Sequence, residues 1–170
     1  MTLTKWCGFD EKSYGSEGAP YNCGMAIPLR APRLGTFFIT SATYNRRRLF
    51  QVPATAELFL ETLQHYRREG YYKLHAFVVM PDHFHLIVTP QGITIDRAMG
   101  FIKGGFSHRL ASKFPVWQRG FTDHRIRDAE DMETRRNYMH KNPVRAGLVV
   151  EAEMYRYSSA YRPVESDLRG

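Results

Sequence analysis

The sequence predicts an α+β domain in which an antiparallel sheet carries two helices on one face and is followed by an additional C-terminal helix. Segments rich in β-branched and aromatic residues, which are typical of strands, alternate with two segments whose apolar residues recur at helical spacing. A Pro-Asp turn joins the second and third strands into a hairpin. The resulting order, β-α-β-β-α-β, is that of the ferredoxin-like split βαβ arrangement.

The first strand and the first helix follow an N-terminal arm. Residues 1–33 mix Gly, Pro and Ser without a clear period, which predicts an irregular segment. Thr36 to Tyr44 is rich in β-branched and aromatic residues and is expected to be a strand. Three consecutive arginines at 46–48 are expected to form a turn. Pro53 to Glu69 then carries apolar residues at helical spacing, and this predicted helix ends at Gly70.

The second half of the domain repeats this alternation. Lys73 to Met80 is expected to be a strand, and the Pro81-Asp82 turn leads into a third strand. Thr94 to Ser112 has a helical apolar stripe, interrupted by Gly104-Gly105. A glycine inside a helix costs about 1 kcal/mol relative to alanine. The pair therefore predicts either a bend or a close approach by another backbone.

The last elements complete the predicted boundaries. A fourth strand is expected at 121–126 and a third helix at 129–142. The domain then covers 34–150 and leaves a C-terminal tail at 151–170. The helices require an apolar sheet face, and the third helix must lie on the opposite face.

Composition narrows the class of protein. The chain has 170 residues, which suits one domain, and 24 Lys+Arg against 17 Asp+Glu give a net charge of +7. This excess favours a polyanionic partner or an acidic membrane surface. No apolar run approaches membrane-spanning length, and we expect a cytoplasmic protein. Cys7 and Cys23 are too few for a disulfide framework or a four-cysteine zinc site, so free thiols are expected.

Two histidines lie two positions apart at the start of the third strand. Successive side chains of a strand point to opposite faces, so His83 and His85 share one face, about 7 Å apart by strand rise. Phe84, Leu86 and Val88 share the other, apolar face. Neutral imidazoles are common ligands of divalent metals. The pair is half of a candidate metal site, and the alternative is two histidines hydrogen-bonded at the surface or in the core.

A tyrosine and an asparagine on the third helix are the candidate partners of the histidines. Tyr138 and Asn142 are four residues apart, so an ideal helix stacks them on one face. Tyrosine supplies a nucleophile and asparagine an oxygen ligand. Each residue also has a structural interpretation: Tyr138 as a packed aromatic residue, and Asn142, which precedes Pro143, as a helix cap.

Three blocks of sequence resemble a known family. The blocks MPDHFHLIVTP, WQRGFTDHRIRD and YMHKNPVRAGLV follow one another within residues 35–150. They are similar to the REP-associated tyrosine transposases, a branch of the HUH single-tyrosine transposases related to insertion-sequence enzymes. The resemblance implies cleavage and rejoining of hairpin-containing single-stranded DNA through a covalent 5′-phosphotyrosine. It implies Tyr138 as the nucleophile, and His83, His85 and Asn142 as metal ligands.

The resemblance also implies a cofactor and a partner. Histidine and amide-oxygen ligands beside phosphate suit Mg²⁺ or Mn²⁺, although histidine also suits Zn²⁺. The expected partner is a REP-like DNA hairpin bound by a monomer. Two other functions stay open. A non-catalytic nucleic-acid-binding regulator would be favoured if Tyr138→Phe changed no activity, and a zinc-dependent hydrolase using a third histidine would be favoured by tightly bound zinc.

The basic residues concentrate between Arg97 and Arg127, where seven stand against one acid. Such a segment predicts either a DNA-binding face or a solvated charged surface. The candidates for DNA binding are Lys103, Arg109, Arg119, Arg125 and Arg127, interleaved with Trp117 and Phe121, which could stack bases or belong to the core. Asp123 and His124 are candidates for orienting a metal ligand or the tyrosine, with a surface hydrogen bond as the alternative.

Overall fold

The structure is a computed structural model that describes residues 34–161. Its strands and main helices follow one another in the predicted order: β1 (Phe37–Ala42), α1 (Pro53–Arg68), β2 (Tyr72–Met80), β3 (His83–Pro90), α2 (Ile95–Leu110), β4 (Thr122–Arg125) and α3 (Ala129–His140). Shorter elements complete the description: the 3-10 turns η1 (Tyr44–Arg46), η2 (Leu49–Gln51) and η3 (Ala152–Met154), and the one-turn helix α4 (Asn142–Arg145). Arm residues 1–33, with Cys7 and Cys23, lie outside the described residues.

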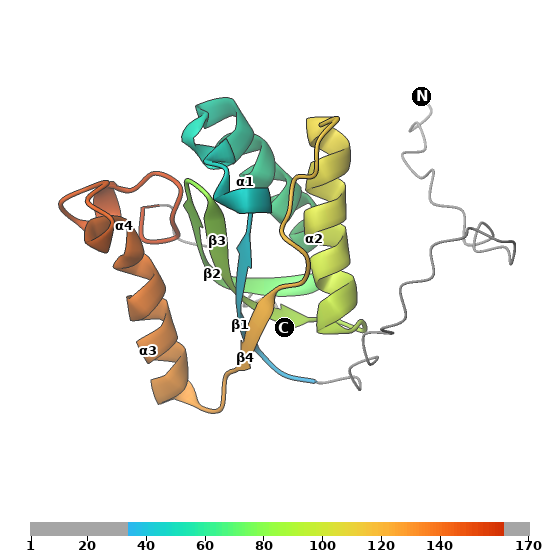
Figure 1. The fold of residues 1–170 in the computed structure, drawn as a ribbon. Coiled ribbons are helices and arrows are strands. Elements are labelled where there is room, and N and C mark those ends of the chain that lie inside the picture. Colours follow the sequence, from blue (N-terminus) through green and yellow to red (C-terminus); the bar gives the residue numbers. More distant parts are fainter. Residues whose placement is uncertain (1–33, 162–170) are drawn as a thin grey trace, which may run out of the picture. The chain divides into compact units, whose positions relative to one another are not determined.

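The four strands form one antiparallel sheet in the order β2-β3-β1-β4 (Figure 1). The two middle strands, β3 and β1, are paired so that Thr40 stands opposite His85 and Ala42 opposite His83. Strand β4 pairs with the outer side of β1 and has only four residues. This order and the α+β composition confirm the predicted ferredoxin-like fold class.

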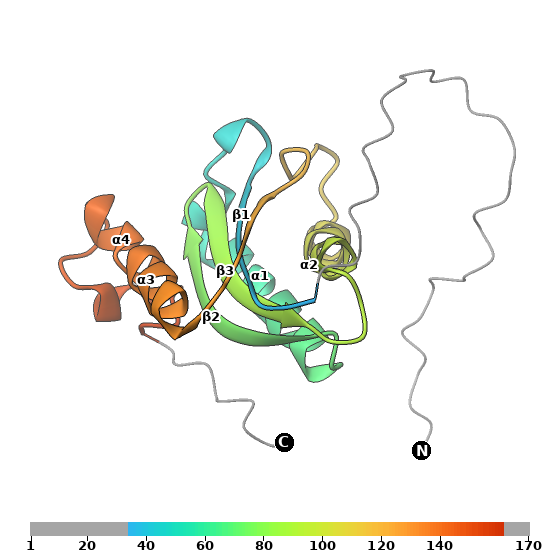
Figure 2. The ribbon, with the colours of Figure 1, turned by 90° about the horizontal axis from the view of Figure 1, so that it is seen from below.

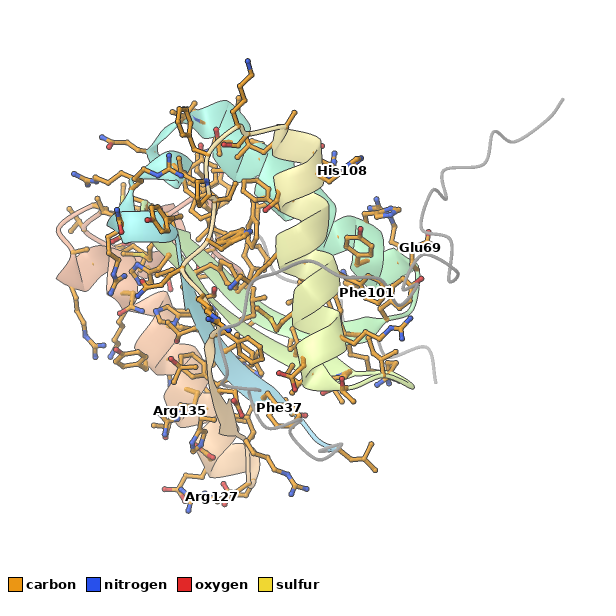
Figure 3. The ribbon with its side chains drawn as sticks, turned by 45° about the vertical axis from the view of Figure 1, so that its right-hand side comes forward. Phe37, Glu69, Phe101, His108, Arg127 and Arg135 are labelled. Carbon is orange, nitrogen blue, oxygen red and sulfur yellow. The ribbon has the colours of Figure 1, made fainter. Side chains whose placement is uncertain are left out.

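The two faces of the sheet are covered by different helices. Helices α1 and α2 lie on one face and α3 lies on the other, as the view along the sheet shows (Figure 2). We call these the two-helix face and the histidine face. Figure 3 shows the same division. Phe101 and His108 mark α2, whereas Arg127 lies just before α3 and Arg135 lies within it.

Aromatic rings form the centre of the core on the two-helix face. The ring of Phe59, from α1, lies 4.8 Å from Phe84 of β3, 5.3 Å from Phe106 of α2 and 5.8 Å from Trp117. All three phenylalanines are fully buried, as the alternation along the third strand predicts for Phe84. Rings at these separations add to the burial of their apolar surface by their quadrupole contacts. Trp117 therefore belongs to the core, where its indole N–H donates to the Lys103 carbonyl.

The glycine pair in α2 marks a close approach rather than a bend. Helix α2 continues through Gly104 and Gly105. A Cβ at Gly105 would lie 2.5 Å from the ring end of Tyr66 on α1, whereas a Cβ at Gly104 would meet nothing within 4 Å. The neighbour that approaches is thus a tyrosine side chain and not a backbone. Only Gly105 is required by this contact between the two helices.

The third helix ends earlier than predicted. Helix α3 stops at His140 and a separate turn, α4, begins at Asn142, so the prediction of one helix over 129–142 is wrong at its end. Pro143 is the cause, because proline has no N–H for the preceding turn and is favoured at the first positions of a new helix. Tyr138 and Asn142 therefore belong to two consecutive helices instead of one continuous face.

The chain beyond residue 150 lies along the outer edge of β2. The N–H of Val79 donates to the Tyr157 carbonyl, and the N–H of Ser159 donates to the Phe77 carbonyl, each at 2.9 Å. These bonds satisfy backbone groups that an edge strand otherwise leaves unpaired. The described part of the expected tail, residues 151–161, thus continues the packing of the domain. Among the described helices, none is both long and apolar enough to cross a membrane.

Candidate active site on the histidine face

The two histidines lie side by side at the start of β3, on the face opposite α1 and α2. Their ring centroids are 5.0 Å apart. The Nδ1 of His83 lies 2.6 Å from a carboxylate oxygen of Asp82, and the Nδ1 of His85 lies 2.7 Å from the hydroxyl of Thr40, its cross-strand partner. Both rings therefore use the same nitrogen to bind the protein, and both leave Nε2 uncommitted by these bonds.

These hydrogen bonds prepare the rings as metal ligands. A carboxylate only accepts, so neutral His83 carries its proton on Nδ1 and its lone pair on Nε2. Burial, with smaller contributions from the neighbouring His83 and Arg46, lowers the pKa of His85 to about 3. His85 is thus neutral at physiological pH. Neutral imidazoles held through their second nitrogen are the usual arrangement around protein-bound metals.

Helix α3 brings Tyr138 to the same place. The Tyr138 ring lies 6.2 Å from the His85 ring and 6.3 Å from the Phe38 ring, in edge-to-face orientation to both. Phe38 is itself stacked on His85 at 5.3 Å. Tyr138 nevertheless stays 45% exposed, and the guanidinium of Arg145, from α4, lies 4.9 Å from its ring centroid. The phenol is therefore held beside the histidines and stays open to an incoming ligand.

Asn142 stands at the first position of α4, directly after the end of the tyrosine helix. Its side-chain nitrogen is buried and has no hydrogen-bond partner within the described residues. A buried amide with unused hydrogen-bonding capacity is costly unless a ligand satisfies it. This nitrogen thus caps no helix carbonyl and is free to donate to an acceptor of a bound group.

The described part of the chain brings no third histidine, cysteine or carboxylate to the histidine pair in a way that would hold a metal ion. Within residues 34–161, no three His, Cys, Asp or Glu side chains converge in a way that would hold a metal ion. Two other histidines have partners elsewhere: His124 bonds Asp131, and His140 bonds Ser159. The expectation of a hydrolase site with a third histidine therefore has no support in the described residues.

Polar contacts anchor the N-terminal end of α3 to the sheet. The Nε2 of His124, on β4, lies 2.8 Å from Asp131 of α3, which also receives the Arg127 N–H at 3.2 Å and the Arg135 guanidinium at 3.3 Å. The hydrogen bond to His124 is the largest cause that lowers the pKa of Asp131 to about 2. The cross-strand partner of His124 is Phe38. This network therefore positions the tyrosine helix over the site.

The C-terminal end of α3 is anchored by the segment beside β2. The Nε2 of His140 lies 2.8 Å from the Ser159 hydroxyl oxygen. That hydroxyl donates to the Phe77 carbonyl. Burial is the main cause that lowers the pKa of His140. His140 is two residues after Tyr138, so both ends of the tyrosine helix are tied to the sheet by a histidine. Met139 is the one buried residue of α3.

The predicted orienting pair is divided by the sheet. Asp123 and His124 are neighbours on β4, so their side chains point to opposite faces. His124 stands opposite Phe38 on the histidine face, and Asp123 stands opposite Ile39 on the two-helix face. The contact that His124 makes toward the tyrosine helix is with Asp131, which the sequence pattern did not single out.

The five predicted DNA-binding cations do not gather around the histidines. The Lys103 ammonium donates to the carbonyls of Gln118 and Gly120 at 3.1 and 2.6 Å, and burial lowers its pKa. Arg109 donates to the Thr62 hydroxyl at 2.7 Å and to the Glu61 carboxylate at 2.8 Å, which joins α2 to α1. Both cations are therefore engaged with the protein on the two-helix face.

The other three cations are exposed. Arg125 stands opposite Phe37, which belongs to the two-helix face. Arg127 lies before the start of α3, with a 77% exposed side chain. Arg119 is exposed in the segment between Trp117 and β4. A DNA-binding role for these three stays a prediction.

Sequence reasoning missed four residues that contact the site. Thr40 and Asp82 hold the histidines, Arg46 lies 3.4 Å from Asp82, and Arg145 covers the Tyr138 ring. Asp82 was visible as the residue before His83. The other three are brought in from β1, the turn after it and α4, and no local pattern marks them.

Comparison with known proteins identifies the family. Residues 36–142 match the family described as Transposase IS200 like. A REP-associated tyrosine transposase of Escherichia coli (strain K12) is 29% identical over 136 residues, which cover 79% of this chain and 81% of the relative. A putative REP-associated tyrosine transposase of Haemophilus influenzae is 26% identical over 152 residues, 79% of this chain and 84% of the relative.

A solved structure agrees with these relatives. It is the structure of a REP-associated tyrosine transposase bound to a REP hairpin, with a TM-score of 0.70, 28% sequence identity, and coverage of 81% of this chain and 84% of that one. The matched family spans both histidines of β3, Tyr138 and Asn142. The resemblance noted in the sequence is thus confirmed. The chain belongs to the IS200-like transposase family, as a DNA-processing enzyme whose relatives are REP-associated tyrosine transposases.

Proposed function

We propose that this protein is a metal-dependent single-strand DNA nickase and strand transferase that uses Tyr138 as its nucleophile. The observation that carries the proposal is the position of Tyr138, whose ring lies 6.2 Å from His85 while 45% of the residue is exposed. A buried tyrosine could not reach a phosphate, and an exposed tyrosine far from the histidines would have no cation to assist it.

The residues present fit a divalent cation. His83 and His85 would supply two neutral nitrogens, and the side-chain oxygen of Asn142, at the first position of α4, would supply the third ligand. With two histidines and no convergent carboxylate among the described residues, the site leaves positions for phosphate oxygens. Mg²⁺ or Mn²⁺ bound there would neutralise the charge on the scissile phosphate and orient it.

In the proposed reaction, the Tyr138 oxygen attacks the phosphorus atom and loses its proton to solvent. The bond between phosphorus and the 3′ oxygen breaks, and that oxygen leaves as a 3′-hydroxyl after taking up a proton. The product is a 5′-phosphotyrosine, which conserves the bond energy, so a second 3′-hydroxyl can reverse the step and join a new strand. Arg145, whose guanidinium lies over the phenol ring, would stabilise the negative charge that the Tyr138 oxygen carries once it has lost its proton.

The proposed substrate is single-stranded DNA that carries a hairpin. Support comes from the solved relative that is bound to a REP hairpin. The net charge of +7 favours a polyanion of this kind. The monomeric state expected from the resemblance stays a prediction, which sedimentation of the protein with and without hairpin DNA would test.

The test is a covalent trapping experiment. The protein is incubated with labelled hairpin-containing single-stranded DNA and Mn²⁺, and a denaturation-resistant adduct is sought on a gel, with mass spectrometry of the labelled peptide. We expect an adduct on Tyr138, none with Tyr138→Phe, and none with wild type in EDTA. Tyr161→Phe is the matched control, since Tyr161 is 51% exposed and should leave the yield unchanged.

Three outcomes would contradict the proposal. An adduct on another tyrosine would refute the assigned nucleophile, and an equal yield in EDTA would refute the metal requirement. Tight hairpin binding without any adduct would favour a non-catalytic DNA-binding regulator instead.

A further inference from the structure

We propose that the exposed turn at Tyr44–Arg48, here called the basic turn, binds single-stranded DNA next to the histidine pair. The inference rests on the proposed function, because it assigns part of the DNA path to a surface outside the 97–127 segment. The basic turn lies between β1 and α1 and has the sequence YNRRR, with three arginines and no acid. Neither the histidine pair nor the tyrosine helix includes any of its residues.

The basic turn is held firmly at its base. Thr43, which is fully buried, donates from its N–H and its hydroxyl to the Asp82 carbonyl, both at 2.9 Å. The N–H of Tyr44 and the guanidinium of Arg47 donate to carbonyls of residues 115–116. These bonds connect the turn to two other loops at once. A turn fixed in this way presents its remaining side chains in a defined position and loses little freedom on binding.

The remaining side chains of the basic turn point into solvent. Asn45 and Arg46 have φ angles of +52° and +53°, the left-handed region that residues with a side chain rarely adopt. Tyr44 is 42% exposed, and the Arg46 side chain is 61% exposed. Arg48 is also exposed. The turn thus offers an aromatic ring, an amide and two guanidinium groups on one short stretch of surface.

One carboxylate connects this surface to the candidate active site. A guanidinium nitrogen of Arg46 lies 3.4 Å from one oxygen of Asp82, and the other oxygen lies 2.6 Å from the Nδ1 of His83. The turn therefore borders the histidine pair, beside the hairpin between β2 and β3 (Figure 1). A DNA strand with one phosphate at the histidines would place its neighbouring phosphates within reach of the basic turn.

The chemistry of the basic turn matches unpaired DNA. Arginines neutralise phosphates, an exposed tyrosine ring stacks on a base whatever its identity, and an exposed amide can bond a base edge. Lys103 and Arg109 each make two hydrogen bonds of 2.6–3.1 Å to groups of the protein, whereas Arg46 makes one longer contact, at 3.4 Å, with Asp82. Cations that border the site and face solvent are better placed to contact DNA than cations bound within the two-helix face.

The test measures binding without cleavage. Fluorescence anisotropy of a labelled single-stranded oligonucleotide in EDTA compares wild type with Arg46→Ala/Arg48→Ala. The matched control is Arg68→Ala/Lys73→Ala, which removes the same charge from exposed residues at the far end of α1 and the adjacent start of β2. We expect about tenfold weaker binding for the turn variant, and a log-log salt slope that is shallower by about 0.7 for each phosphate that this variant no longer neutralises. Equally weakened binding in both double variants would overturn the proposal.

A second pair of variants tests stacking. Tyr44→Phe keeps the ring and should bind within about twofold of wild type, whereas Tyr44→Ala should bind about tenfold more weakly. Circular dichroism confirms that each variant is folded. Equal affinities for the two variants would remove stacking from the proposal.

The two proposals fail in different ways. If wild type forms no covalent adduct but the basic-turn variants still bind DNA selectively more weakly, the strand-transferase proposal fails and the basic turn stands. If adducts form on Tyr138 while the turn variants bind like wild type, the basic-turn proposal fails and the transferase proposal stands.

Discussion

The two faces of the sheet are built from different interactions. On the two-helix face, α1 and α2 bury Phe59, Phe84 and Phe106 in one aromatic cluster, and two cations, Lys103 and Arg109, are engaged in bonds within the protein. On the histidine face, α3 contributes one buried residue, and histidine contacts anchor both of its ends.

This difference shows why charge counted along the sequence does not by itself indicate which cations are open to a ligand. A basic residue on a helix that packs against another helix can be consumed by nearby carbonyls and hydroxyls. Where packing is sparse, arginines stay near the surface beside aromatic rings, as Arg135 lies beside Phe38 and Arg145 beside Tyr138. Arginine thus joins two helices on the two-helix face, as Arg109 does, whereas on the histidine face Arg145 lies over the ring of the exposed Tyr138.

The largest expected effect tests whether the chemistry belongs to the histidine face. His85→Ala should reduce adduct formation below detection, because it removes a metal ligand. Thr40→Val should lower Mn²⁺ affinity about 10–100-fold, because it removes the hydroxyl that orients the ring. Calorimetry measures the metal affinity and trapping measures the adduct. The control is His75→Ala on β2, whose Nε2 contacts Thr89; disappearance of the adduct there as well would contradict a specific role for His85.

The aromatic cluster should dominate stability. Phe59→Ala removes a fully buried ring that contacts Phe84, Phe106 and Trp117, so the free energy of unfolding should fall by about 3–5 kcal/mol. Tyr138→Phe, on the histidine face, should change it by less than about 0.5 kcal/mol. Urea denaturation measures both. A comparable decrease from the two substitutions would contradict the contrast between the faces.

The glycine pair in α2 offers a matched test of how tightly the two helices pack. Gly104→Ala meets open space and should stabilise the protein by about 0.5–1 kcal/mol through helix propensity. Gly105→Ala places a methyl group 2.5 Å from the Tyr66 ring end and should be about 1–3 kcal/mol less stable than Gly104→Ala. Thermal denaturation compares them, and equal melting temperatures would mean that Tyr66 moves away freely.

The segment beside β2 should contribute a smaller amount. The Tyr155 hydroxyl donates to the Val79 carbonyl at 2.8 Å in a buried position, so Tyr155→Phe should cost about 1 kcal/mol of unfolding free energy. Urea denaturation measures it, with Tyr161→Phe as the exposed control. No difference between the two variants would show that residues beyond 150 add little to the domain.

The smallest expected effect concerns acid. The pKa of Asp131 is lowered to about 2, chiefly by the hydrogen bond to His124. An acid whose pKa falls on folding stabilises the protein above its unfolded pKa of about 4, and this contribution disappears as the pH falls toward 2. The difference in melting temperature between wild type and Asp131→Asn should therefore shrink from pH 5 to pH 2. A constant difference over this range would mean that the ionised carboxylate does not anchor α3.

The sequence by itself determined the element order, the apolar face of the third strand and the common face of His83 and His85. These are local properties, because side-chain direction repeats every two residues in a strand and the apolar stripe repeats every turn in a helix. The grouping of Tyr138 with the histidines followed from the family resemblance and from the need to place the third helix on the free face. The structure confirms that grouping, while the chemical roles of these residues stay predictions.

Only the tertiary structure decided which residues meet across the sheet. Thr40 reaches His85 because the register of β1 on β3 places them opposite each other, and Arg46 reaches Asp82 because two turns meet at the same end of the sheet. Lys103, a candidate for DNA binding, bonds two carbonyls of the protein because the loop before β4 returns to α2. Contacts between residues distant in sequence depend on register and on loop paths, and no local periodicity records either of them.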